Sequence, residues 1–297
     1  MRLPVLLLFA SLLQAQSIAL SFDDGPAPGQ KVALDAAGKN RAILAALEAA
    51  KVPSVLFVAG SRCLDDPAGR ALVRAWGEAG HRIANHSYAH AYFHAKKATL
   101  EAFEADFEKN DALIRGLPGY AKWFRFPYLK EGDTAAKRDG ARAFLKARGY
   151  RNGHVTIDAS DWYYDQRLHA RLAREPAADL APYRRAYLDH LRDRAAYYDG
   201  LARRVLGRDV RHVLLLHHNL INALFLPDVI GMFRDLGWTF ISPAEAYADP
   251  AYALEPGVLP AGESLVWSLA KEKGVQDLRS PGEDGAYEQP KLDALGL

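Results

Sequence analysis

The sequence has little cysteine, little net charge and no apolar run long enough to anchor it in a membrane. Its one cysteine, Cys63, excludes an intramolecular disulfide, and no His or Cys cluster surrounds it as a zinc knuckle requires. Lys and Arg number 38 against 36 Asp and Glu, so no overall field favours nucleic acid or an anionic membrane as a partner. The apolar run 5–13 is shorter than the roughly 20 residues that span a bilayer. We therefore expect no integral membrane segment in the mature chain.

The first 16 residues have the pattern of a signal peptide. Arg2 supplies one positive charge, residues 5–13 form a short apolar core, and the small residue Ala15 lies near the expected cleavage point. We expect residues 1–16 to be removed and the protein to be exported, either to the periplasm or out of the cell. A buried first strand or helix is the alternative.

The rest of the chain alternates between short apolar runs and longer segments with helical periodicity, which predicts an α/β fold around a mostly parallel sheet. Strands are expected at 18–22, 54–58, 82–84, 123–126, 155–157, 210–216 and 238–241. Helices are expected at 41–50, 67–78, 100–115, 141–148 and 224–236, with another starting at Ser242. We predict one domain over residues 17–249, followed by an extension of unknown role over 250–297.

Two details refine this assignment. Thr99 is placed to cap the helix 100–115, and Ser242 with Glu245 forms a capping-box pattern.

The long segment 163–211 carries an apolar helical stripe and many Arg and Tyr residues. An amphipathic helix with a solvated Arg face is the expected interpretation, and a sugar-stacking wall beside a cleft is the alternative.

Polar residues follow the ends of the predicted strands. They are Asp23 and Asp24, His86 and His90, Arg125, Asp158 and Asp161, and His217. In a barrel of parallel strands the carboxyl ends of the strands share one face, and that face carries the catalytic site. Residues spread over nearly two hundred positions are therefore expected to meet in one cleft.

The residue types in that cleft favour metal-assisted hydrolysis. His86 and His90, spaced i and i+4, are expected to share one face of a helical turn and bind one ion, while Asp23 and Asp24 offer one ligand and one base. Such a set leaves coordination positions open, as a catalytic Zn²⁺ requires, and Co²⁺ or another divalent ion is an alternative. Taken alone, Asp24-Gly25-Pro26 is also a common turn sequence.

In chain order, five motifs resemble those of the polysaccharide deacetylases of carbohydrate esterase family 4. They are Ser21-Phe-Asp-Asp-Gly-Pro26, His86-Ser-Tyr-Ala-His90, Arg125-Phe-Pro-Tyr128, Asp158-Ala-Ser-Asp-Trp162 and Leu214-Leu-Leu-His217. The resemblance covers roughly 18–247. It implies a distorted (β/α) barrel with a single catalytic domain. The implied activity is the metal-dependent removal of acetyl groups from N-acetylated amino sugars of a chitin-like or peptidoglycan-like poly- or oligosaccharide.

The same resemblance implies a role for each motif residue. Asp24, His86 and His90 would bind the metal, and Asp23 would be the base that deprotonates the attacking water, held by Arg125. The backbone N–H of Tyr128 would donate to the oxyanion, and Trp162 and Leu215 would enclose the acetyl methyl group. His217, held cationic by Asp161, would protonate the leaving group.

Alternatives remain at this stage. An O-acetyl xylan esterase would use the same site, and a non-catalytic glycan-binding protein would share the fold. His218 follows His217 and competes for its role, although strand alternation allows only one of the two side chains to face the cleft, and the apolar run favours His217. The remaining histidines, His81, His94, His154, His169, His190 and His212, are expected on the surface or behind the site.

Overall fold

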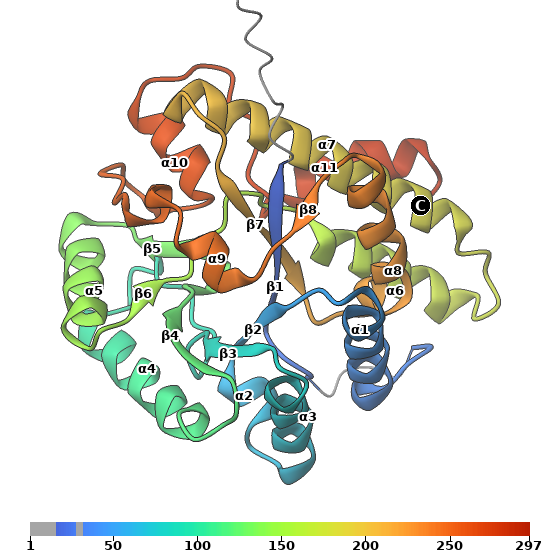
Figure 1. The fold of residues 1–297 in the computed structure, drawn as a ribbon, viewed down its shortest axis with the longest axis horizontal. Coiled ribbons are helices and arrows are strands. Elements are labelled where there is room, and N and C mark those ends of the chain that lie inside the picture. Colours follow the sequence, from blue (N-terminus) through green and yellow to red (C-terminus); the bar gives the residue numbers. More distant parts are fainter. Residues whose placement is uncertain (1–15, 28–31) are drawn as a thin grey trace, which may run out of the picture.

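The computed structural model describes residues 16–27 and 32–297 and centres on a curled, parallel β-sheet (Figure 1). Its strands are β1 (Ser17–Asp23), β2 (Ser54–Val58), β3 (Arg82–Asn85), β4 (Tyr120–Phe124), β6 (Arg151–Asn152), β7 (Arg211–His217) and β8 (Thr239–Phe240). They lie in the order β6-β4-β3-β2-β1-β7, and β8 pairs with β1. All of these pairs are parallel, as the sequence predicts.

Strand β1 has three neighbours in the sheet. β7 pairs along the whole of β1, whereas β8 pairs with Ser17 and Ile18 and β2 pairs with residues 20–22. Beyond β6, Ile157 forms an isolated parallel bridge with Leu214 of β7, so the chain crosses from one edge of the sheet to the other. These connections confirm the expected α/β class and the distorted barrel.

The prediction of a strand at 155–157 was wrong. The N–H of Val213 donates to the hydroxyl Oγ1 of Thr156 at 2.9 Å, so a side chain takes the place of a backbone acceptor in the ladder. On the other side, the N–H of Leu265 donates to the carbonyl of Val155 at 2.9 Å. The segment is held by both neighbours and keeps only the single bridge.

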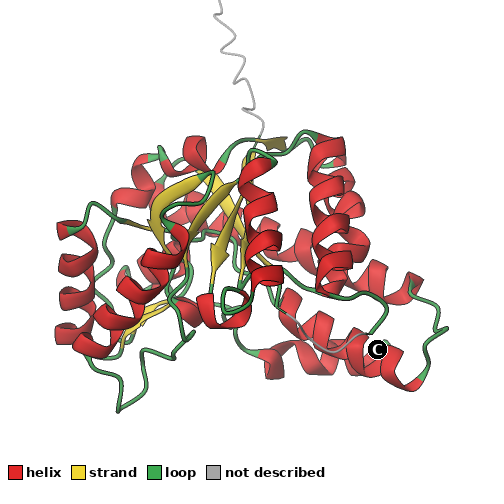
Figure 2. Ribbon diagram, turned by 90° about the horizontal axis from the view of Figure 1, so that it is seen from below, coloured by secondary structure: helices red, strands yellow, loops and turns green. Residues whose placement is uncertain are grey.

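Helices cover the outside of the sheet (Figure 2). They are α1 (Ala36–Ala50), α2 (Gly60–Cys63), α3 (Pro67–Glu78), α4 (Leu100–Ile114), α5 (Ala135–Ala147), α6 (Asp161–Arg174), α7 (Ala181–Leu206), α8 (Leu220–Asp235) and α9 (Pro243–Tyr247). Thr99 caps α4, and Ser242 and Glu245 form the predicted capping box. α1 begins earlier than the periodicity indicates, because the Asp35 side chain accepts from the N–H of Gly38 and caps it there.

The long segment 163–211 contains most of α6 and all of α7. Tyr183, Tyr187, Leu191 and Tyr198 of α7 are buried in the main apolar core. These side chains pack inward, as expected for an amphipathic helix, and do not form a sugar-stacking wall.

The last part of the chain packs against the barrel. It contains η2 (Pro250–Ala253), β9 (Ala261–Gly262), α10 (Leu265–Glu272) and α11 (Gly285–Ala294). β9 pairs antiparallel with β5 (Lys130–Gly132), which follows the turn η1 (Pro127–Leu129). Figure 1 places α10 and α11 (red-orange and red) beside α7. Residues 250–297 therefore contact the edge of the barrel on which the polar motifs lie.

The signal-peptide prediction for residues 1–16 lies outside the described residues except for Gln16, whose carbonyl accepts from the N–H of Thr239 at 2.7 Å. Among the helices in the described ranges, none is long and apolar enough to cross a membrane.

Candidate active site

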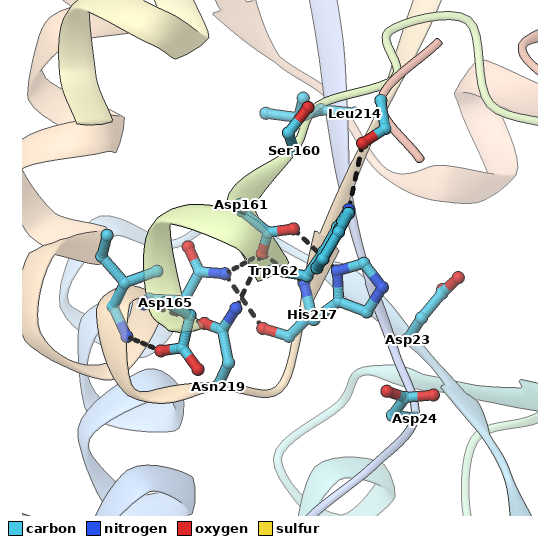
Figure 3. A network of polar contacts seen from close by, with 12 residues as sticks. Asp23, Asp24, Ser160, Asp161, Trp162, Asp165, Leu214, His217 and Asn219 are labelled. Carbon is cyan, nitrogen blue, oxygen red and sulfur yellow. Dashed lines mark hydrogen bonds and ion pairs between the residues drawn. The ribbon is translucent and has the colours of Figure 1, made fainter. Parts of the chain in front are cut away.

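Two motif residues end adjacent strands side by side. Asp23 is the last residue of β1, His217 is the last residue of β7, and the two are partners in the strand register. His86 directly follows β3, and Arg125 directly follows β4. In Figure 3 the His217 ring lies between Asp161 on one side and Asp23 and Asp24 on the other. Parallel pairing has thus brought the distant motifs to one edge of the sheet.

His86 and His90 converge through a loop, and the expected helical turn was wrong. Ser87 has φ of 65° and His90 has φ of 53°, values that no helical turn contains. The hydroxyl of Ser87 accepts from the N–H of His90 at 3.0 Å, and the carboxylate of Asp106 accepts from the N–H groups of Tyr88 and Ala89 at 2.9 Å. These local hydrogen bonds hold the left-handed residues in place.

Asp24, His86 and His90 form a group that fits a divalent metal ion. One potential ligand atom from each lies within 4.8 Å of the others. His86 Nδ1 lies 2.8 Å from the carbonyl of Arg125, which fixes the proton on Nδ1 and leaves Nε2 free to bind a metal. Asp24 Oδ2 accepts from Arg62 at 3.0 Å, while its Oδ1 is buried and accepts no hydrogen bond. Two nitrogen ligands and one carboxylate suit Zn²⁺ or a similar ion.

Burial sets the charge state of these ligands. It lowers the pKa of both His86 and His90 to about 3, so both imidazoles are neutral at pH 7, as metal binding requires. Burial would raise the pKa of Asp24, but nearby His217, His90 and Arg62 outweigh it and leave that pKa below its usual value. Asp24 is therefore a carboxylate.

Asp23 is held by a fully buried arginine. Arg125 Nη1 donates to Asp23 Oδ1 at 2.6 Å and to the Ser21 hydroxyl at 2.9 Å. Arg125 Nε donates to the carbonyl of Gly153 at 2.8 Å, so the guanidinium has little freedom to move. Burial raises the pKa of Asp23 even though Arg125 opposes that shift. Asp23 is thus a fixed carboxylate with enhanced proton affinity, which suits a general base.

Asp161 binds both the ring and the backbone of His217. Its Oδ1 lies 2.7 Å from His217 Nδ1, and its Oδ2 accepts from the His217 N–H at 2.8 Å. Asn219 and Asn222 also donate to Oδ2, at 3.1 and 2.7 Å. Burial lowers the pKa of His217, but Asp161 outweighs burial and raises it to about 10. The imidazole is cationic at pH 7, with Nε2 left free.

His218 has a different environment. Its Nε2 lies 3.0 Å from Asn40 Oδ1, and its ring lies 6.2 Å from that of Trp76, on the other face of β7. Burial lowers the pKa of His218 to about 3, so the ring is neutral. His218 does not share the surroundings of His217.

These residues open into a cavity of about 700 Å³. Asp23, Asp24, His86, His90, Tyr128, Trp162 and His217 line it. Arg125 and Asp161 lie behind the lining and support Asp23 and His217. Leu215 is buried in the core and is not among the lining residues. None of residues 163–211 lines the cavity either.

Several cavity residues were not predicted from the sequence. Arg62 belongs to α2, Lys130 begins β5, and Glu263, Glu283 and Asp284 come from the C-terminal extension. Only Lys130 lies near a motif, two residues after Tyr128. The other four stand in segments without recognisable pattern, so no signal in the sequence could have found them.

The structure is thus a distorted parallel barrel with one carboxylate and two histidines grouped at its carboxyl edge. Residues 12–144 match the family model described as polysaccharide deacetylase, and this match confirms the resemblance seen in the motifs. The matched stretch contains Asp23, Asp24, His86, His90 and Arg125 and ends before Asp161 and His217. No curated protein matches the chain significantly.

Solved structures share the fold at low sequence identity. A family 4 carbohydrate esterase from Streptomyces lividans in complex with acetate has 23% identity and a TM-score of 0.50, over 78% of this chain and 95% of that one. The peptidoglycan deacetylase PdaC from Bacillus subtilis has 20% identity and a TM-score of 0.51, over 78% and 90%. A mutant of a CE4 family pseudoenzyme with restored enzymatic activity has 16% identity and a TM-score of 0.53, over 78% and 68%.

Proposed function

We propose that this protein is a metal-dependent hydrolase that removes acetyl groups from the N-acetylated amino sugars of a chitin-like or peptidoglycan-like glycan. One observation carries the proposal: a metal-ligand set, a fixed carboxylate and a cationic imidazole face a single cavity. Asp24, His86 and His90 would hold the ion. A Zn²⁺ or Co²⁺ ion bound there supplies Lewis acidity, which activates water and polarises the acetyl carbonyl.

The protein's own groups move the protons. Asp23 takes a proton from the attacking water, and Arg125 keeps the carboxylate aimed at the cavity. The water oxygen bonds to the acetyl carbon, and the backbone N–H of Tyr128 donates to the oxygen that gains negative charge. Tyr128 has a backbone N–H, which Pro127 lacks, and Tyr128 lines the cavity.

His217 completes the reaction from the opposite side. As a cation, it donates its Nε2 proton to the sugar nitrogen while the carbon–nitrogen bond breaks. The products are acetate and a free amino sugar, and the proton on Asp23 balances the one that His217 has given up. Asp161 acts through His217 as a positioning residue.

Trp162 and Leu215 are proposed to surround the acetyl methyl group. Trp162 lies on the cavity wall, and its indole Nε1 donates to the carbonyl of Gly282 at 3.0 Å, which fixes the ring plane. The assignment of Leu215 rests on its motif, because this residue is buried in the core and does not line the cavity. We further propose that the protein is exported, on the evidence of the signal-peptide pattern in residues 1–16.

The test is acetate release by the purified protein, with added Zn²⁺ and after chelation, from chitin oligomers, peptidoglycan fragments and acetylxylan. Zinc-dependent release from an N-acetylated glycan supports the proposal. Release from acetylxylan alone would assign an O-acetyl esterase. Glycan binding with full metal occupancy and no acetate release from any of the three would assign a non-catalytic binding protein.

A further inference from the structure

The C-terminal extension reaches the candidate active site through Gly282. The N–H of Gly282 donates to Asp158 Oδ2 at 2.7 Å, and its carbonyl accepts from the Trp162 indole at 3.0 Å. A Cβ atom at this position would lie 2.4 Å from Asp158 Oδ1, so only glycine permits the approach. Two residues of one motif thus hold the extension from both sides.

A buried ion pair anchors the next turn of the extension. Glu288 of α11 accepts from Arg194 of α7 at 2.6 Å, and both side chains are almost completely buried. Arg194 also donates to the carbonyl of Ser280 at 2.7 Å. His190 Nδ1 lies 3.4 Å from Glu288, and His190 Nε2 accepts from the N–H of Ser160. The segment between residues 280 and 288 is therefore fixed at both ends.

Glu283 lies within this fixed segment and lines the cavity with His217 and Trp162. Within residues 16–27 and 32–297, its carboxyl group makes no hydrogen bond or ion pair. Among the described residues, the two non-histidine cations on the cavity wall already have partners, Lys130 with Glu263 and Arg62 with Asp24. Burial, with a smaller contribution from Asp158, raises the pKa of Glu283 to about 7. A half-buried carboxyl group without a protein partner gains most from a ligand that donates hydrogen bonds.

We propose that Glu283 is a specificity-determining residue that accepts a hydrogen bond from the bound glycan and selects neutral amino-sugar chains over chains that carry carboxylates. This inference rests on the proposed function and narrows its substrate class. A sugar hydroxyl or amide N–H offers the donor that Glu283 lacks, whereas a sugar carboxylate beside it adds like-charge repulsion in a partly buried site. Lys130 does not offset that repulsion because Glu263 occupies it.

The test compares the Glu283→Gln variant with the parent in a zinc-loaded Asp23→Asn background, where turnover does not consume the ligand. The probes are the N-acetylglucosamine tetramer and a peptidoglycan disaccharide that carries the muramic acid carboxylate, each measured by calorimetry at pH 8. We expect Glu283→Gln to weaken tetramer binding and to strengthen binding of the carboxylate-bearing disaccharide. The ratio of the two affinities should change by about tenfold, which corresponds to about 1.4 kcal/mol. Glu78→Gln, a matched change on the exposed face of α3, should leave the ratio unchanged.

In the parent with an intact Asp23, Glu283→Gln should raise KM for the tetramer with little effect on kcat, because the contact is made in the ground state as well. An unchanged affinity ratio, or failure of the N-acetylglucosamine tetramer to bind the parent, overturns the assignment of Glu283. Because the binding comparison does not require acetate release, loss of the proposed deacetylase activity and loss of the Glu283 assignment give different results.

Discussion

Asp161 makes two contacts with His217: its Oδ1 lies 2.7 Å from the ring Nδ1, and its Oδ2 accepts a hydrogen bond from the backbone N–H at 2.8 Å. Because one carboxylate fixes both the position of the strand end and the orientation of the ring, the imidazole can turn only its Nε2 toward the cavity. The two asparagines that also donate to Oδ2 keep Asp161 itself from rotating. The acid side of the site is thus rigid without any metal.

Replacing Asp161 by Asn should move the pH dependence of activity. Asp161 is the main reason that the pKa of His217 is raised to about 10, so Asn should lower that pKa, by roughly 1–3 units for loss of an adjacent opposite charge. The proton donor is then lost at lower pH, and the basic limb of the kcat/KM profile should shift downward. If turnover is too slow to measure, an NMR titration of the His217 imidazole reports the same change in pKa. An unshifted limb would contradict the role given to Asp161, and Asp189→Asn on the exposed face of α7 serves as the control.

Replacing Asp23 by Asn should leave zinc binding intact and reduce kcat by roughly 10²–10⁴-fold, the usual contribution of a general base. Calorimetric zinc titration and acetate release on the same preparation separate the two effects. The variant should also melt earlier, since Arg125 loses the carboxylate partner that lies 2.6 Å away in a buried site. Rates must therefore be measured well below the melting transition. Undiminished turnover would remove Asp23 from the mechanism.

Removing the metal should abolish acetate release and lower the melting temperature, and added Zn²⁺ should restore both. An ion at 100 times its Kd stabilises the folded state by about 2.7 kcal/mol. His90→Ala should weaken zinc binding by more than about 100-fold, a loss greater than that for residues that only support a ligand. His169→Ala changes a histidine of α6 that does not line the cavity and should bind zinc normally. Zinc binding by His90→Ala at parental affinity would place the metal elsewhere.

Replacing Glu288 by Ala should destabilise the fold by about 3–5 kcal/mol, because Arg194 would remain buried without its partner. Urea unfolding measures this change, and Glu78→Gln should leave the unfolding free energy within about 0.5 kcal/mol of the parent. A parental midpoint for Glu288→Ala would show that the ion pair contributes nothing to stability.

The same residue should make stability depend on pH in the acid range. Burial opposes ionisation of Glu288, but His190 and Arg194 outweigh it and lower its pKa to about 2 from 4.5. A carboxyl group with a lowered folded-state pKa stabilises the fold above its unfolded pKa. That contribution is therefore lost as pH falls from about 4.5 to about 2. Glu288→Gln should unfold with a shallower dependence on pH in this window.

Some strands and helix ends could be predicted from the sequence because they depend on interactions between residues close together in the chain. Runs such as 54–58 and 210–216 are apolar without alternation, which is the pattern of a strand buried on both faces, and each formed a strand within one residue of its predicted ends. Thr99 and Ser242 cap helices because a cap needs only the residue and the backbone that follows it. The prediction of a strand at 155–157 was wrong because the Thr156 hydroxyl, in place of a backbone carbonyl, accepts the hydrogen bond from the Val213 N–H. A hydrophobic pattern cannot reveal such a side-chain contact.

For the candidate site too, some features could be predicted from the sequence and others depend on the tertiary structure. The sequence by itself determined which residues stand at strand ends, and parallel pairing then had to bring Asp23 and His217 to one edge. Only the tertiary structure decided the loop path that joins His86 to His90, the burial that keeps both rings neutral, and the separation of His217 from His218. It also placed Glu283 in the cavity. That placement depends on contacts of Gly282 with residues more than a hundred positions away, and such contacts arise from packing and leave no periodic signal in the chain.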